Sequence, residues 1–245
     1  MTGRLDYLPR EEIFKLRPEE VKRSLDKTEL EAIFLACNAF WHHPGEKNIQ
    51  APHVELTSGK HSNIYVNCPQ VLERSNLCQI MAYQILQLLF KHYPCNIDWV
   101  VGSDSAALGL AKDVANLTNA KWRPLQKNPD KTQTWEKGTI LPDENVLHIE
   151  ELLTTGGTTK AVRDGIHAGN FYPVNFIPFI PVLVHRPDPD APDVIEESKI
   201  IHLLHYDTYV VDPSKEECQL CQKGSPALPA KENWTELVNS MLGGS

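Results

Sequence analysis

The sequence predicts an α/β fold in which a parallel sheet is flanked by helices. Its central region alternates short strand-like runs with longer helical patterns, in the order strand, helix, strand, loop, strand, helix, strand. Right-handed crossovers between parallel strands place the loops that follow the strands along one edge of the sheet, where ligands bind in such folds. The length of 245 residues suits one large domain, or a domain with a small appendage, with a substantial core.

The N-terminal half of the chain leads into this alternation. Its first 27 residues are charged and patchy, which predicts an arm or a short helix. Residues 28–41 carry apolar side chains at helical spacing, with Thr28 as the N-cap, and Pro44 and Gly45 end the segment. Strand-like and helical patterns then alternate: two short strands within residues 54–67, a helix over 76–93, a buried strand over 98–102 and a helix over 106–117.

The C-terminal half continues the alternation around one long polar segment. Residues 126–139 are polar and charged, and a loop of this length inside a compact domain is often a functional lid. Residues 174–185 are apolar but broken by Pro178 and Pro181, which predicts an edge strand or a bent strand. The other patterns predict strands over 120–125 and 145–149, a helix over 157–167, one or two strands over 199–211 and a terminal helix over 233–242.

Composition excludes several classes of protein. The 24 basic and 32 acidic residues give a formal charge of −8, which disfavours a general duplex-DNA binder but allows a local basic site for a small anion. No apolar run reaches the roughly 18–20 residues needed to cross a bilayer, and the N-terminus lacks the apolar segment of a signal peptide. The six cysteines are therefore expected to be reduced thiols. Together these features predict a cytoplasmic enzyme or binding protein.

The segment with the most chemical content lies between a strand and a helix. A buried strand ends in Glu150 and Glu151, a turn containing Gly156 and Gly157 follows, and a helix then begins. Backbone N–H groups at such a turn, together with the positive end of the helix dipole, form a site for an anion of phosphate size. Threonine hydroxyls can add hydrogen bonds to it, from Thr154, Thr155, Thr158 and Thr159.

Two carboxylates beside a phosphate site need a further explanation, because like charges repel. They are useful if the ligand also carries sugar hydroxyls or Mg²⁺, both of which bind acceptor oxygens. A phosphate and a diol on one ligand indicate a sugar phosphate. The alternative is a Gly-Gly turn with threonine helix caps and two solvated acids. Neither the P-loop pattern nor the dinucleotide-binding Gly-x-Gly-x-x-Gly pattern is present.

The apolar strand, acid pair and Thr-Thr-Gly-Gly-Thr sequence resemble the phosphoribosyl pyrophosphate (PRPP) motif of type I phosphoribosyltransferases. The run Ser-Gly-Lys-His-Ser and its surroundings, residues 55–66, are similar to the N-terminal segment of the orotate phosphoribosyltransferases in that family. Residues 100–111 resemble their pyrophosphate loop, and residues 218–226 resemble a C-terminal segment of some bacterial members. The resemblance covers roughly residues 50–225 and is closest to the orotate branch.

This resemblance implies a domain organisation and a reaction. It implies a parallel sheet flanked by helices with a small N-terminal hood: an N-terminal arm and helix in residues 1–50, the phosphoribosyltransferase-like domain with its hood in 51–225, and a C-terminal tail helix in 226–245. The implied reaction displaces pyrophosphate from C1 of PRPP by a ring nitrogen of orotate or a related base, with Mg²⁺ as cofactor, in pyrimidine nucleotide biosynthesis. It also implies a homodimer, and no nucleic-acid or membrane partner.

The resemblance assigns expected roles to individual residues. Glu150 and Glu151 would act in catalysis by holding the ribose hydroxyls, directly or through Mg²⁺-bound water. Thr154 and Arg186 would contact orotate. Arg186 follows an apolar strand, and its guanidinium would pair with the carboxylate of orotate. Tyr65 and Val66 would line the base pocket, although Tyr65 also fits simple core packing. Lys60 would reach a phosphate or else be a solvated turn residue. The 5′-phosphate would lie on Thr154, Thr155, Gly156, Gly157 and Thr158.

The polar segment resembles the mobile catalytic loop of the family, which reaches across the dimer into the neighbouring site. Lys127, Lys131 and Lys137 are its candidates for pairing with pyrophosphate; a solvated charged loop is the alternative. Some positions depart from the family pattern. Glu151 replaces the usual Asp, and residues 102–106 replace the usual Gly-Pro-Ala with Gly-Ser-Asp-Ser-Ala. These departures leave two other functions open: transfer to another base, and a non-catalytic PRPP-binding regulator.

Cys218 and Cys221 form a Cys-x2-Cys pair, which is half of a structural zinc site. His202 and His205 lie upstream and are the candidates to complete four ligands. Free thiols or a simple turn are the alternatives.

Overall fold

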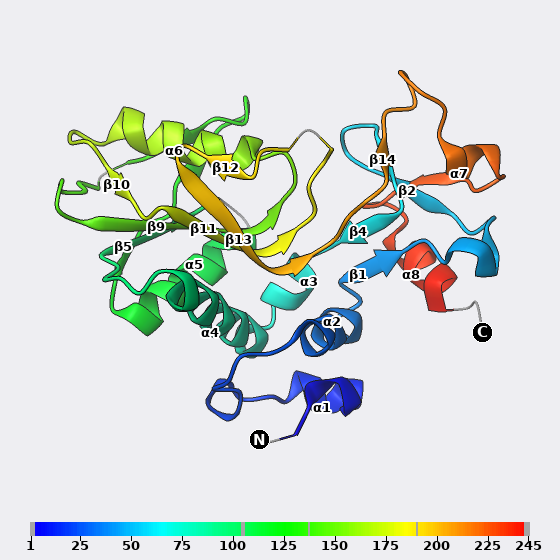
Figure 1. Ribbon diagram of the computed structural model, residues 1–245, viewed down its shortest axis with the longest axis horizontal. Helices are drawn as coiled ribbons and strands as arrows, with labels where there is room; N and C mark the ends of the chain where they lie inside the picture. The colour runs from blue at the N-terminus through cyan, green and yellow to red at the C-terminus, as the bar shows by residue number, and fades with distance from the viewer. Residues whose placement is uncertain (1–2, 104–105, 137, 190, 243–245) are drawn as a thin grey trace.

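A twisted, mostly parallel sheet forms the main body of the computed structural model, which describes residues 3–103, 106–136, 138–189 and 191–242 (Figure 1). Its strand order is β12-β13-β11-β9-β5-β6, with β10 also paired to β9. Among the described strands of this sheet, only β12 runs antiparallel to its neighbour. The strands are β5 (Trp99–Gly102), β6 (Lys121–Trp122), β9 (Asn145–Leu153), β10 (Asn175–Phe176), β11 (Phe179–His185), β12 (Val194–Ile195) and β13 (Ser198–His205). The predicted parallel sheet is thus confirmed.

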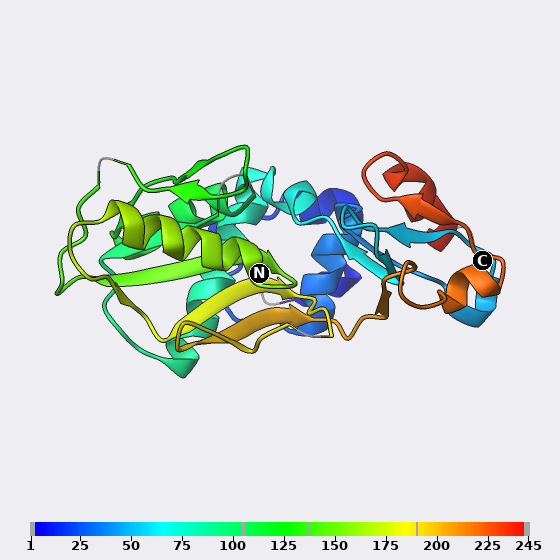
Figure 2. The same cartoon turned by 90° about the horizontal axis from the view of Figure 1, so that it is seen from above.

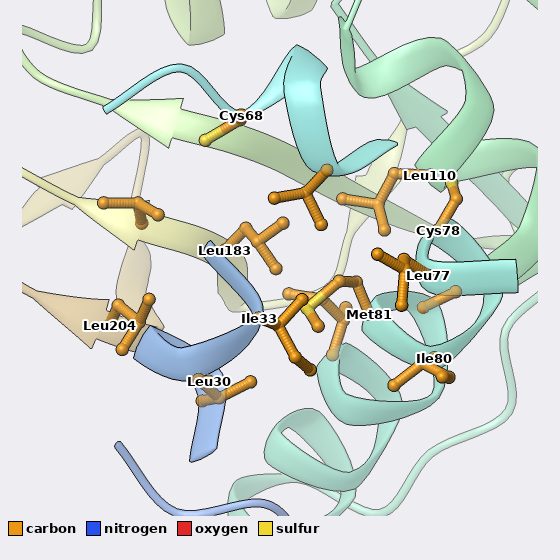
Figure 3. Close-up of a cluster of buried hydrophobic side chains, with 14 of the residues drawn as sticks. Leu30, Ile33, Cys68, Leu77, Cys78, Ile80, Met81, Leu110, Leu183 and Leu204 are labelled. Carbon is orange, nitrogen blue, oxygen red and sulfur yellow. The ribbon is translucent and has the colours of Figure 1, made fainter. Parts of the chain in front are cut away.

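Helices cover both faces of this sheet. Helix α6 (Gly157–Gly169) lies on one face, and α4 (Ser75–His92) and α5 (Ala106–Thr118) lie on the other (Figure 1). The main core is packed between α4, α5, the sheet and α2 (Lys27–Ala36). Figure 3 shows Ile33 of α2 and Met81 of α4 beside Leu183 of β11. A second cluster, which includes Val162 and Ile166, lies under α6. None of the described helices is long and apolar enough to span a membrane.

A smaller lobe, here called the hood, lies beside the end of the sheet toward which β13 runs (Figures 1 and 2). Its sheet has the order β14-β3-β2-β15 and joins segments far apart in sequence. A second pair of strands, β1 and β4, lies next to it, with α8 packed against Trp41. The hood elements are β1 (Phe40–His42), β2 (His53–Glu55), β3 (His61–Ser62), β4 (Ile64–Val66), β14 (Val210–Val211), α7 (Gln219–Gln222), β15 (Ala227–Pro229) and α8 (Trp234–Leu242), with the short helix η3 (Gly45–Asn48). The short helix α3 (Pro69–Leu72) follows β4 and belongs to the main body, where Val71 is part of the main core cluster.

The N-terminal segment is packed into the main body. It contains η1 (Leu5–Tyr7), α1 (Arg10–Phe14) and η2 (Pro18–Glu20). Its apolar side chains belong to the main core cluster, and each is at most 8% exposed: Leu5, Ile13, Leu16, Val21 and Leu25. The segment is therefore part of the core of the main body.

Helix α2 begins and ends at different residues from those predicted. Asp26, rather than Thr28, is the N-cap, because its side chain accepts a hydrogen bond from the backbone N–H of Glu29 and Glu29 reciprocates. The helix stops at Ala36 because Asn38 adopts a left-handed φ of 50°, and the Ala39 N–H bonds back to the Phe34 carbonyl. Residues 40 and 41, predicted as the end of this helix, belong to strand β1 (Phe40–His42) instead.

Two C-terminal predictions also need correction. The segment predicted as an edge strand or a bent strand is not at an edge: its residues 179–185 form an interior strand, paired with β13 on one side and β9 on the other. Pro181 is tolerated because pairing with β9 begins only at Val182. The polar segment is not one open loop: β7 (Gln126–Lys127) and β8 (Gln133–Thr134) form a hairpin in it, and that hairpin packs on α6.

Candidate active site

The turn between β9 and α6 is open to solvent. Thr155, Gly157 and Thr158 are exposed, and no side chain caps the N-terminus of α6. Gly156 occupies the N-cap position with φ of 77°, a left-handed conformation that L side chains rarely adopt. A Cβ built there would also lie 2.7 Å from Ile195 Cδ1. The turn therefore leaves backbone N–H groups at a positive helix end available to an anion.

The acid pair lies just before this turn, in the last part of β9. Glu150 is 2% exposed; its Oε2 accepts a hydrogen bond from Ser103 Oγ at 2.6 Å, and its Oε1 lies 3.0 Å from His148 Nε2. Glu151 Oε2 is buried and has no hydrogen-bond partner among the described residues. Glu150 is thus fixed by neighbours, whereas Glu151 keeps a free acceptor oxygen.

A chain of hydrogen bonds fixes the orientation of Glu150. Arg163 of α6 is fully buried, and its Nε–H donates to His148 Nδ1 at 3.4 Å. His148 must then carry its proton on Nε2 and donate it to Glu150. Burial is the main cause that lowers the pKa of His148 to about 3, so the imidazole is neutral at pH 7. Arg163 is itself held by Ser198 Oγ at 2.8 Å.

Burial also acts on the charges of the acid pair. It is the main cause that raises the pKa of Glu150 above its usual range. Burial and repulsion from Glu150 raise the pKa of Glu151. The ligand-free site therefore favours at least one protonated carboxyl group, and a cation or a donor hydroxyl that binds there favours the ionised pair.

Arg186 lies at the end of β11, where it meets the hood. It is 5% exposed, and its Nη1 lies 3.4 Å from both Ser62 Oγ and the Ile64 carbonyl oxygen. Its Nε is buried without a hydrogen-bond partner among the described residues. Burial lowers the pKa of this guanidinium, which nevertheless remains protonated. A buried donor with no partner indicates a place for an acceptor such as a carboxylate.

Lys60 connects the hood to the same edge of the sheet. It lies in the turn between β2 and β3, and its Nζ is 2.7 Å from Asp188 Oδ2, in the loop that follows β11. Asp188 in turn donates its backbone N–H to the Thr154 carbonyl oxygen at 3.3 Å. The hood hairpin, the β11 loop and the open turn are therefore in direct contact.

The two residues expected to line the base pocket have different surroundings. The ring of Tyr65 packs 5.3 Å from that of Trp234, and burial raises the pKa of its hydroxyl. Val66 is 3% exposed and belongs to the main core cluster. Their strand, β4, offers the Ile64 carbonyl to Arg186. Both residues thus contribute to packing beside the site.

The candidate lysines lie on the polar segment. Lys127 is exposed on β7, and Lys131 is exposed in the hairpin turn with φ of 70°. The segment is anchored by Trp135, which is 3% exposed and packs edge-on against Trp99. Lys137, and Asp104 and Ser105 of the pyrophosphate loop, lie outside the described residues.

Four residues of this site were not identified from the sequence. His148 lies two positions before Glu150 in the strand, so alternation puts both side chains on one face. Arg163 sits between Val162 and Ile166 on the buried face of α6, which is an unusual place for a charge. Ser103 lies in the segment that resembles the pyrophosphate loop but was given no role of its own, and Asp188, which follows a strand end, gave no local signal. The first two could have been found from their positions alone.

The donor set fits the Mg²⁺ that the resemblance implies. The observation that supports this fit is Glu151 Oε2, a buried oxygen that has no hydrogen-bond partner among the described residues and lies next to a second carboxylate. Carboxylate oxygens are the protein ligands that Mg²⁺ prefers, often through its bound waters. The residues present are therefore suited to a hydrated magnesium ion.

Comparison with solved structures shows which known folds this one resembles. The chain is similar to orotate phosphoribosyltransferase from Aeropyrum pernix, with a TM-score of 0.50, 14% identity, and coverage of 72% of this chain and 93% of that one. It is also similar to UMP synthase of Leishmania donovani, with a TM-score of 0.54 and 17% identity over 88% of this chain and 41% of that longer one. These likenesses show that the chain has the fold of the type I phosphoribosyltransferases.

Sequence comparison narrows this class. No sequence model of a known protein family matches the chain. It is 31% identical over 180 residues to the orotate phosphoribosyltransferase of Thermoanaerobacter sp. (strain X514), which covers 73% of this chain and 87% of that protein. The chain belongs to the orotate phosphoribosyltransferase family, and it is a phosphoribosyltransferase.

Proposed function

We propose that this protein transfers the phosphoribosyl group of PRPP to orotate and releases pyrophosphate, in pyrimidine nucleotide biosynthesis. The observation that carries the proposal is the open turn after β9, which lies beside the acid pair and connects through Asp188 to the hood. Along this edge of the sheet, the turn is complementary to a phosphate, the acid pair to a pentose and Arg186 to an aromatic acid. Family membership supports the same assignment.

The turn and the acid pair are suited to PRPP. The free N–H groups at the start of α6, with Thr154, Thr155 and Thr158, would hold the 5′-phosphate. Glu150 and Glu151 would accept hydrogen bonds from the ribose hydroxyls. As the C1–O bond to pyrophosphate breaks, positive charge develops on the sugar ring, and the nearby carboxylates stabilise it.

Arg186 is suited to the base. Its buried guanidinium retains a donor without a partner, and a guanidinium pairs bidentately with a carboxylate. Orotate carries one carboxylate, whereas uracil, hypoxanthine and adenine carry none. Arg186 would therefore orient the ring nitrogen of orotate toward C1 and select against the neutral bases.

The leaving pyrophosphate carries negative charge that must be neutralised. Mg²⁺, when bound, would neutralise part of that charge, and Glu150 and Glu151 would hold the ion directly or through water. Lys127, Lys131 and Lys137 are the proposed partners of pyrophosphate on the polar segment. In the proposed homodimer this segment would reach the site of the neighbouring subunit and exclude water from C1.

The proposal is tested by following the loss of base absorbance with PRPP and Mg²⁺. Orotate is expected to be consumed, and uracil, hypoxanthine and adenine are not. Glu151→Ala should abolish turnover, whereas Glu216→Gln, an exposed acid of the hood, should leave it unchanged. Consumption of a different base would assign another phosphoribosyltransferase activity. Calorimetric binding of Mg²⁺-PRPP without turnover of any base would instead indicate a regulator.

A further inference from the structure

Four side chains with metal-ligating atoms meet in the hood, away from the acid pair. They are His53 of β2, His61 of β3, Cys218, and Cys221 of α7. Their ligand atoms all lie within 4.8 Å of one another, and three of the four residues are buried. They come from two segments of chain separated by more than 150 positions in the sequence.

The distances match those around a tetrahedral zinc ion. Zinc bonds of about 2.3 Å to sulfur and 2.0–2.1 Å to nitrogen place S and N ligands about 3.6 Å apart and two N ligands about 3.3 Å apart. The sulfurs of Cys218 and Cys221 both lie 3.6 Å from His53 Nε2. Cys221 Sγ lies 3.5 Å from His61 Nδ1, and the two ring nitrogens are 3.1 Å apart.

Hydrogen bonds alone do not account for this arrangement. His53 Nε2 has three close neighbours, Cys218 Sγ, Cys221 Sγ and His61 Nδ1. A neutral ring nitrogen offers either one proton or one lone pair, so it can form only one of these bonds well. Four such atoms directed at one another are best satisfied by a cation at their centre.

A second hydrogen bond selects the ligating form of His53. Ser225 Oγ donates to the Ala51 carbonyl oxygen at 2.5 Å, so its hydroxyl proton is already used. Ser225 must therefore accept a hydrogen bond from His53 Nδ1–H, at 2.8 Å. This leaves a lone pair on His53 Nε2, directed at the cluster. Such a second hydrogen bond is the usual support of a zinc-bound histidine.

We propose that His53, His61, Cys218 and Cys221 bind one structural zinc ion. Both thiols lose their protons to solvent on binding, and the two imidazoles bind as neutral ligands. Four protein ligands fill the tetrahedron, so the ion has no open position for substrate. It fastens α7 to the β2–β3 hairpin. The residues on either side of His61 are Lys60 and Ser62, which contact Asp188 and Arg186, so the ion holds that hairpin against the active site.

The sequence offered His202 and His205 as candidates to complete a zinc site with this cysteine pair, and the structure places both histidines elsewhere. His202 and His205 lie on β13 beside His185, where they form a separate cluster of three histidines. His53 and His61 lie on β2 and β3, more than 150 positions before the cysteine pair in the sequence. Only folding brings them to Cys218 and Cys221. The separate histidine cluster supplies a control for the experiment.

Metal analysis of the protein purified without a histidine tag tests the proposal. About one zinc per chain is expected in the wild type. Cys221→Ser and His61→Ala should reduce this to less than about a tenth, whereas Cys95→Ser and His202→Ala should keep it. Ser225→Ala should keep the stoichiometry but lose zinc to a chelator about 10–100-fold more readily. Unchanged zinc in Cys221→Ser, or loss of zinc in His202→Ala, would overturn the proposal.

A measurement on the wild-type protein covers the case in which a variant does not fold. Replacing the metal with Co²⁺ should give the thiolate-to-cobalt absorption and the intense visible bands of a tetrahedral site. Thiol titration of the metal-bound protein should find Cys218 and Cys221 unreactive until a chelator is added. An octahedral cobalt spectrum, or a disulfide between the two cysteines in freshly purified protein, would reject the site.

Discussion

Glu150 and Glu151 are two neighbouring carboxyl groups in surroundings that disfavour their charge. Burial raises the pKa of both, and for Glu151 repulsion from Glu150 adds to this effect. Between the ordinary carboxyl pKa of 4.5 and the raised values, the folded protein holds more protons than the unfolded chain. Its free energy of unfolding must therefore fall as pH rises through that window.

The first prediction concerns this fall. In the absence of ligand, the free energy of unfolding should decrease from about pH 5 to about pH 8, and Glu151→Gln should flatten the decrease, since a neutral amide removes both the titration and the repulsion. Urea denaturation at several pH values measures the slope. Glu216→Gln should keep the wild-type slope. Parallel curves for wild type and Glu151→Gln would contradict the explanation.

Arg186 supports a second prediction at the scale of one residue. Arg186→Lys keeps the charge but removes the planar fork, so the KM for orotate should rise about 10–100-fold, corresponding to about 1.4–2.7 kcal/mol. Affinity for Mg²⁺-PRPP, measured by calorimetry, should change little, because the proposed 5′-phosphate site is the turn after β9. An equal loss of affinity for both substrates would show that Arg186 acts on the whole site.

At the scale of elements, α6 contributes to the site through both its end and its sides. Its N-terminus forms the open turn, and its buried face carries Arg163 to His148. Its other side supports the β7–β8 hairpin, where Gly165 allows close contact: a Cβ built there would lie 2.1 Å from the Gln133 carbonyl oxygen. The position of the lysine-bearing segment therefore depends on this helix.

Gly165→Ala tests that dependence. The added methyl group should displace the hairpin, destabilise the protein by about 1–3 kcal/mol and increase hydrogen exchange in residues 126–135. Gly109→Ala is the matched control in α5, where the new Cβ would lie 3.7 Å from Cys78 Sγ, an ordinary contact distance. Because alanine has a better helix propensity than glycine, the stability of this variant should be equal to that of the wild type or slightly higher. If both variants had the same stability and the same hydrogen exchange in residues 126–135, the contact between Gly165 and Gln133 would not be what holds the hairpin.

Elements were predicted from sequence most accurately where the pattern was long and apolar. The helices at 75–92 and 106–118 and the buried strands β5 and β9 were confirmed because local periodicity determines them. The end of α2 was missed because one Asn in a left-handed conformation overrides an apolar pattern that continues to Trp41. The place of β11 was missed because strand order is set by tertiary pairing.

The candidate site was predictable to a similar extent. The turn and the acid pair are contiguous in sequence, so a local motif was sufficient to find them. His148 and Arg163 required the faces of a strand and a helix to be compared. Lys60 with Asp188, and His53 with the Cys218–Cys221 pair, join positions far apart in the chain, which no local pattern relates.

At the scale of the whole molecule, the segment of residues 5–25 contributes to the main core. Leu16→Ala should therefore destabilise the protein by about 2–5 kcal/mol, the usual result of truncating a buried leucine. Tyr7→Ala removes a larger side chain from the same segment, but one that is 80% exposed, and should change stability by less than about 0.5 kcal/mol. Urea denaturation measures the free energy of unfolding of both variants. A negligible effect of Leu16→Ala would mean that the segment is a detachable arm.

The pairing of β2 with β15 has a consequence for synthesis of the chain. β2 lies between β3 and β15 in the hood sheet, and β15 ends at Pro229, close to the C-terminus. One edge of β2 therefore has no backbone partner until the chain has been synthesised as far as residue 229. The main sheet can be completed earlier, since its last strand ends at His205. The hood is thus completed after the main sheet, and a premature stop before residue 227 would leave a folded body with an unfinished hood.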